Sequence, residues 1–199
     1  MKSLGILVAI VLVALAGCTG NVRDEAPDDA HSIALENSRN AIREMARKTL
    51  ADLYSRQPGA RSAVEGATGY AVFSNFGMKI LVAGGGKGEG MAVEHATQRE
   101  VFMRMAEVQA GLGYGIKKFR LVWVFETQQA FDRFVDSGYE FGSQATLAAK
   151  VSGQGSGYAG AISVSPGVWV YQITDDGLAA ELTVKATRYY RDGALDAAH

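Results

Sequence analysis

The hydrophobic pattern of the N-terminal third predicts one long amphipathic helix over residues 32–57. Apolar or small side chains recur at helical spacing and share about one third of the circumference at about 100° per residue. These positions are Leu35, Ile42, Met45, Ala46, Thr49 and Leu53. Pro58 and Gly59 follow the pattern and predict the end of the helix.

After a short helical or loop stretch at residues 60–67, the pattern changes to short apolar runs, which predicts β-strands. Residues 119–125 are apolar on both faces of a strand and indicate a central, buried one. The expected strands cover residues 69–74, 78–84, 90–95, 100–111, 112–126, 162–165, 168–174 and 178–190.

One brief helix interrupts the strands at residues 128–137, with Thr127 as its N-cap and Gly138 as its stop. Helices do not alternate regularly with strands, so a parallel α/β sheet is not expected. The predicted fold class is therefore α+β. Its curved, mostly antiparallel, barrel-like sheet would pack against the N-terminal helix and the short second helix.

Glycines alternate at positions 84, 86, 88 and 90, again at 111, 113 and 115, and again at 153, 155 and 157. A phosphate loop around Lys87 would need glycine at 81 and a hydroxyl at 88, but these are Leu81 and Gly88. The G-x-G-x-x-G match at 155–160 precedes a strand and a turn where a dinucleotide fold requires a helix. We therefore expect no nucleotide and no cofactor, and we interpret the glycines as architectural, letting the sheet bend.

The chain starts with Lys2 and an uncharged apolar run from Leu4 to Gly17, which is short for a bilayer span and typical of a secretory signal. The run ends in LAGC at 15–18, which resembles the lipobox of bacterial lipoproteins. This resemblance implies cleavage after residue 17 and acylation of Cys18, the chain's one cysteine. Thr19 in place of a retention aspartate favours the outer membrane, with the domain facing the periplasm.

Residues 18–31 lack apolar periodicity, carry four acidic residues against Arg23, and are predicted to be a flexible tether. Cleavage after residue 17 would change the formal net charge of the chain from −1 to −2 by removing Lys2. The folded part is close to neutral, so we expect no nucleic-acid partner.

Catalytic and metal-binding patterns are weak. His31, His95 and His199 have no metal-ligand spacing, and no G-x-S-x-G motif accompanies a serine. Glu89 and Glu94 form a conceivable carboxylate pair, although exposed strand acids are the simpler interpretation. Asp175 and Asp176 lie in a predicted Asp-Gly hairpin turn. We expect a non-catalytic protein without a metal ion.

Basic residues form the remaining candidate site. Arg39, Arg43 and Arg47 recur every four residues beside the apolar stripe, and residues 38–56, including Lys48, carry a charge of +3. Such a ridge could contact anionic headgroups, or it could be the solvated shoulder of a surface helix. Lys118 and Arg120 would share one strand face and form a second basic spot.

The segments ATGYAVFSNFG, GGGKGEG, QAGLGYG, WVFETQQAFDRFVDSGYEFGSQATLAA and KATRYYRD, in this order, resemble the SYLF domain. That resemblance covers about residues 34–192 and implies a lipid-binding module. Eukaryotic members bind phosphoinositides through a basic N-terminal helix, some yeast members bind actin, and bacterial members are often lipid-anchored. Arg39, Arg43, Arg47 and Lys48 lie on the corresponding helix.

The expected organisation is a signal at 1–17, a tether at 18–31, a SYLF-like domain at 32–192 and a tail at 193–199. The expected function is binding of anionic phospholipid at the bacterial envelope. The alternative is an envelope assembly protein that recognises a protein partner.

Overall fold

The computed structural model describes residues 27–80, 83–110, 115–141, 158–175, 177–178 and 187–196. The proposed signal, Cys18 and most of the proposed tether lie outside these residues, as do most of the second and third glycine sets. The described helices are α1 (Pro27–Arg56), α2 (Gly59–Glu65), α3 (Gln128–Asp136) and α4 (Gly193–Asp196). The strands are β1 (Gly69–Ile80), β2 (Ala83–Glu94), β3 (Glu100–Ala110), β4 (Gly115–Phe125), β5 (Tyr139–Phe141), β6 (Ile162–Ser165), β7 (Val168–Thr174), β8 (Gly177–Leu178) and β9 (Thr187–Arg191).

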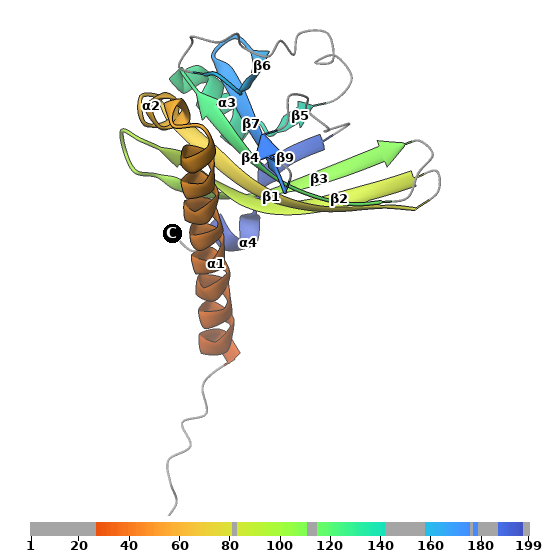
Figure 1. Cartoon of the computed structure of the whole chain (residues 1–199). Coiled ribbons are helices and arrows are strands. Elements are labelled where there is room, and N and C mark those ends of the chain that lie inside the picture. Colours follow the sequence, from red (N-terminus) through yellow and green to blue (C-terminus); the bar gives the residue numbers. More distant parts are fainter. Residues whose placement is uncertain are drawn as a thin grey trace, which may run out of the picture.

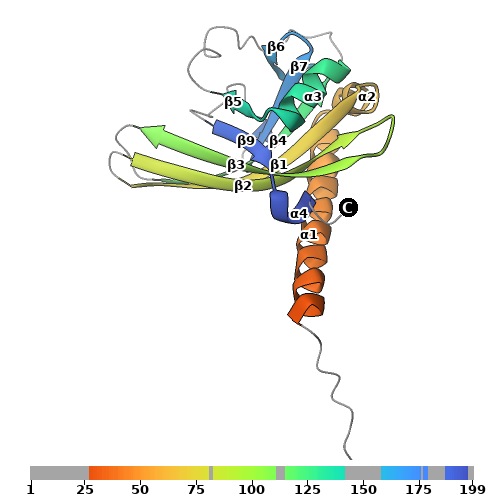
Figure 2. The same cartoon turned by 180° about the vertical axis from the view of Figure 1, so that it is seen from behind.

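These strands form one antiparallel sheet in the order β5-β9-β3-β2-β1-β4-β7-β6, with β8 paired to β7. The sheet curls into a half-barrel in which the long strands β1 to β4 extend well beyond the helices (Figure 1). The predicted α+β class with a curved, antiparallel sheet is confirmed. Figure 2, seen from behind, shows α1 crossing the convex side while α3 lies on the opposite side.

Hydrophobic residues pack on both faces of the sheet. The inner face carries an aromatic cluster with α3, in which the rings of Trp123 and Phe134 lie 5.1 Å apart and those of Phe73 and Tyr189 lie 4.9 Å apart. The outer face packs against α1 and α2. Val72 of β1, for example, belongs to one hydrophobic cluster with Ile42, Ala46 and Leu53 of α1. Two apolar faces explain why residues 119–125, apart from Arg120, are apolar on both sides of the strand.

Helix α1 buries the predicted stripe: Ile42, Ala46, Thr49 and Leu53 are all at most 4% exposed, and Leu35 and Met45 pack beside them. The helix begins at Pro27, however, so the prediction that residues 27–31 belong to a flexible tether is wrong. Proline suits the first turn because its missing N–H would have no helical partner there. Residues 29–38, apart from Leu35, are exposed, because the start of α1 projects past the sheet (Figure 1).

Two other sequence boundaries are corrected. Residues 69–74 and 78–84 were expected to be separate strands, yet β1 runs unbroken through Asn75 and Gly77 because both pair with β2 and β4. The predicted tail begins with helix α4, whose Leu195 is buried and whose Asp196 carboxylate accepts from the Phe102 N–H at 3.1 Å. The N-cap at Thr127 and the turn between β7 and β8 are confirmed.

The glycine strip of β2 lies on the inner face, where neighbouring side chains occupy the space above its bare backbone. Met105 lies over Gly88, Phe73 lies over Gly90, and the Asn75 amide lies over Gly86. A Cβ at Gly88 would come within 2.5 Å of the Met105 Cγ and 2.6 Å of the Ser74 carbonyl oxygen. For β2, therefore, the architectural interpretation of the glycines is confirmed.

Candidate functional site

Arg39 does not belong to a solvent-facing ridge. Its residue is only 5% exposed, and its guanidinium donates to the Leu195 carbonyl oxygen at 2.9 and 2.7 Å and to the Glu36 carboxylate at 3.1 Å. Those bonds tie α4 to α1. The prediction of an accessible row that includes Arg39 is wrong, because helical spacing alone did not show that α4 covers this position.

Arg43 is also engaged within the fold. Its side chain is 30% exposed, bonds to Glu100 on β3 at 2.8 Å and to Glu36 at 3.0 Å, and lies 5.2 Å from the centre of the Phe102 ring. Burial lowers the pKa of Arg43, but the two carboxylates outweigh it and leave that pKa raised. Arg43 therefore docks α1 on the sheet.

Arg47 and Lys48 are the exposed members of the predicted ridge, with side chains 73% and 70% exposed. Both pair with Glu44, and the hydrogen bonds from Arg47 and then Lys48 lower the pKa of that carboxyl group. Lys48 lies one helical turn before Asp52, on the flank that faces β4, whereas Arg47 lies about 100° away around the helix. One carboxylate thus offsets one of these two charges.

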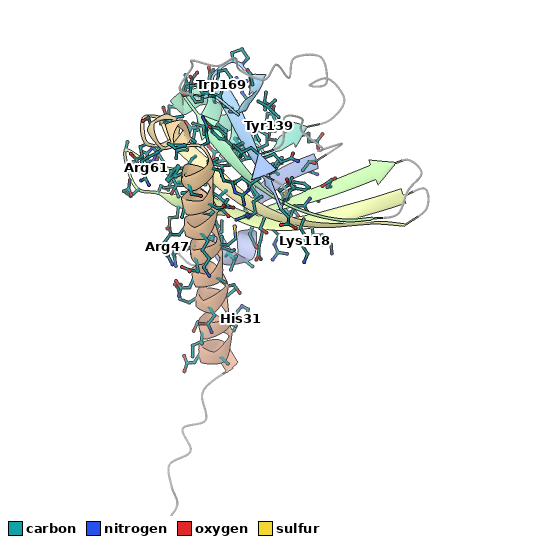
Figure 3. The ribbon with its side chains drawn as sticks, in the orientation of Figure 1. His31, Arg47, Arg61, Lys118, Tyr139 and Trp169 are labelled. Atoms are coloured by element: carbon teal, nitrogen blue, oxygen red, sulfur yellow. The ribbon has the colours of Figure 1, made fainter. Side chains whose placement is uncertain are left out.

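The strand register brings further cations onto the outer face, beyond the part that α1 covers. One cross-strand row runs Tyr190, Arg104, Glu89, Ser74, Arg120. Two residues further along the strands, Lys87 and Lys118 flank Phe76 in the next row. As expected from the sequence, Lys118 and Arg120 share a face. Figure 3 shows Lys118 on the underside of the long strands, the same side as α1.

Two adjoining hollows of about 360 and 410 Å³ lie over these rows and share Ser74. We call them the outer-face groove, whose lining includes Ser74, Lys87, Glu89, Arg104, Lys118, Arg120, Asp175 and Tyr190. Four of these side chains are cationic and two are acidic. The sequence did not indicate Lys87, Arg104 and Tyr190 as site residues. Alternation shows which face of its own strand each residue occupies, but not which residues of other strands lie beside it.

Carboxylates compensate part of the groove. Arg104 pairs with Asp192 at 2.5 Å, and Arg120 pairs with Asp52 of α1 at 2.6 Å. Arg56 first, and then Arg120, hold the pKa of Asp52 below its usual value despite its partial burial. Lys87 is exposed and forms no ion pair within the described residues. The groove therefore carries three exposed cationic residues, Lys87, Arg104 and Lys118, and both Arg104 and the partly exposed Arg120 are anchored by a carboxylate.

Within the part of the chain that the structure describes, the acid and histidine candidates make separate contacts. Glu89 is exposed on the outer face of β2, whereas Glu94 is buried and accepts from Thr97 and Gln128. The two carboxylates therefore form no pair. His95 contacts the Ala67 carbonyl oxygen at 2.8 Å through Nδ1. Within the described residues, no group of three or more histidines and acids could hold a metal ion.

One polar pair is buried on the inner face. The Asn75 amide donates to the Glu107 carboxylate at 2.6 Å, and these residues are 3% and 2% exposed. The two residues come from β1 and β3 and face each other across Gly86 of β2. The pair occupies the space that a side chain at position 86 would fill. Glycine is therefore required at this position for the pair to form.

In the part of the chain that is described, no helix is sufficiently long and apolar to span a bilayer. No protein-family model matches the chain. Over 160 residues, the sequence is 31% identical to "Beta cell expansion factor A" of Aeromonas veronii. The alignment covers 80% of this chain and 59% of that relative, so this chain corresponds to little more than half of the relative's length. The chain is thus similar to a longer bacterial protein.

Proposed function

We propose that this protein is a lipid-anchored envelope protein whose SYLF-like domain binds anionic phospholipid headgroups without catalysis. The observation that carries the proposal is the outer-face groove, where Lys87 and Lys118 are exposed beside the anchored Arg104 and Arg120. Arginine and lysine pair well with phosphate oxygens, and each cation near an anionic surface contributes about 1 kcal/mol. In this proposal the groove replaces the Arg39 and Arg43 part of the ridge, while Arg47 and Lys48 remain as exposed cations on α1.

The direction of α1 supports the proposal. The projecting start of α1 and Lys118, which lines the groove, lie on the same side of the sheet (Figures 1 and 3). Helical residues 27–38 extend about 18 Å at 1.5 Å per residue. Residues 18–26 could span about 30 Å when extended. An anchor at Cys18 would therefore hold the groove within reach of the membrane that carries it.

The anchor is tested separately from the groove. We expect cells to label the wild-type protein with palmitate and to retain it in the membrane fraction, because a multiply acylated residue holds a membrane durably. The Cys18→Ser protein should lose the label and leave that fraction. Equal labelling of both proteins would refute acylation at Cys18 and leave the groove hypothesis standing.

The groove is tested with a chain that starts at Thr19, since both hydrophobic clusters lie within residues 35–195. We expect this chain to float with vesicles that contain phosphatidylglycerol and not with pure phosphatidylcholine. The double substitution Lys87→Gln and Lys118→Gln should weaken binding about 30-fold, since two cations contribute about 2 kcal/mol together. Raising the salt concentration should weaken wild-type binding as well.

A matched control removes the same charge elsewhere. Arg61 on α2 and Arg99 in the β2–β3 connection are exposed and do not line the groove. The double substitution Arg61→Gln and Arg99→Gln should leave vesicle binding within about threefold of wild type. Equal loss in both double variants would show only a net-charge effect. Absence of wild-type binding would instead favour recognition of a protein partner.

A further inference from the structure

Arg133 on α3 differs from most arginines of the described chain. Each of the others, except Arg99, forms an ion pair with a carboxylate. Arg133 is exposed and has no such partner among the described residues. Its guanidinium is therefore available to an anion from outside the chain, and it lies beside a pocket.

The pocket lies between α3, β5 and the turn that joins β6 to β7, and its volume is about 230 Å³. The buried side chains of Phe125, Phe134 and Val168 line it from the core side. The full lining is Phe125, Thr127, Gln129, Ala130, Arg133, Phe134, Tyr139, Ser165, Pro166 and Val168, in which Arg133 is the one charged residue. The site therefore combines an apolar interior with a single positive charge.

The walls of the pocket are held in place by contacts of their own. Thr127 accepts from the Ala130 N–H and caps α3, while the rings of Phe125 and Phe134 lie 4.9 Å apart. Tyr139 on β5 and Ser165 at the end of β6 both line the pocket, so the two edges of the sheet meet there. A preformed pocket loses less free energy to ordering when a ligand binds.

We propose that this pocket binds a medium-chain fatty carboxylate, with the alkyl chain against Phe125, Phe134 and Val168 and the carboxylate on Arg133. The volume of about 230 Å³ is small, so the proposal commits to a medium-length alkyl chain of octanoate size. Arginine binds a carboxylate through two parallel hydrogen bonds. The site lies on the inner-face side of the sheet, so it does not depend on the outer-face groove.

The test is calorimetric titration of sodium octanoate into the chain that starts at Thr19. We expect saturable binding at one site, at least tenfold weaker binding after Arg133→Gln, and near-wild-type binding after Arg133→Lys. Octanol, which lacks the charge, should bind at least tenfold more weakly than octanoate. Ala130→Phe should abolish binding by filling the pocket, with circular dichroism showing that this variant is folded.

Arg99→Gln provides the control, because this arginine also lacks an ion pair but does not line the pocket. Binding that is non-saturable, or that weakens equally in Arg99→Gln and Arg133→Gln, would overturn the proposal. The outcome is separable from the headgroup hypothesis, since Arg133→Gln should not change flotation with phosphatidylglycerol vesicles. Failure of the wild-type chain to float with these vesicles, with octanoate binding intact, would refute only the groove.

Discussion

Gly90→Ala is expected to destabilise the protein by about 3 kcal/mol, a large effect for one added methyl group. A Cβ at this position would overlap the Val72 carbonyl oxygen and come within 2.5 Å of the Phe73 ring. The carbonyl belongs to the adjacent strand β1, so the methyl group can be accommodated only if the two strands separate or the sheet flattens. Equilibrium urea unfolding, followed by circular dichroism, measures the change.

Gly85→Ala is the matched control on the same strand. Gly85 is exposed on the outer face, and its nearest neighbour to an added Cβ is the Glu107 carbonyl oxygen at 3.5 Å, an ordinary contact. Alanine there should leave the free energy of unfolding within about 0.5 kcal/mol of wild type. If the two substitutions cost the same, the close approach above Gly90 is not what requires glycine, and strand propensity would explain both.

The role of the β2 glycines was predictable from the sequence. Alternation with period two places Gly86, Gly88 and Gly90 on one face whatever the register, and the surrounding residues matched no phosphate motif. The α1 stripe was predictable for the same reason, since burial of one helix face follows from spacing alone. Local periodicity was sufficient for both features because each depends on a single element.

The candidate site was less predictable because it depends on pairs of elements. The spacing of Arg39, Arg43 and Arg47 correctly placed them beside the apolar stripe, but could not show that α4 would bury the first or that β3 would bind the second. Lys87 and Lys118 are 31 positions apart, and their shared face follows from the pairing of β1 with both β2 and β4. Two antiparallel registers had to be known before this groove could be seen.

The Asn75–Glu107 pair is also invisible in the sequence, where Asn75 lies between the predicted strands at 69–74 and 78–84. In the structure it lies within β1 and faces the interior, and its amide supplies a hydrogen bond to a carboxylate on β3. A buried polar side chain of this kind is retained because removing it leaves its partner poorly satisfied. The strand prediction is wrong here because the apolar run ends before Asn75, whereas the backbone of Asn75 continues to pair with both neighbouring strands.

Asn75→Asp should therefore be strongly destabilising at neutral pH, although the two side chains have nearly the same shape. It replaces a donor that lies 2.6 Å from the Glu107 carboxylate by a second carboxylate, in a site where both residues are at most 3% exposed. Two buried carboxylates at this separation cannot both ionise, so one must retain a proton. Raising one carboxyl pKa by about two units costs about 2.7 kcal/mol.

The sign of the pH dependence identifies the cause. A carboxyl group whose pKa is higher in the folded than in the unfolded protein loses stability as the pH rises through the unfolded value, about 4. The destabilisation by Asn75→Asp, measured by urea unfolding, should therefore be small near pH 4 and grow toward pH 7.

Asn40→Asp makes the same charge change on the exposed side of α1, where the Asn40 side chain already accepts from Arg43 at 2.9 Å. It should leave stability unchanged or slightly raised at pH 7, and a pH-independent loss in Asn75→Asp would refute charge repulsion as the mechanism.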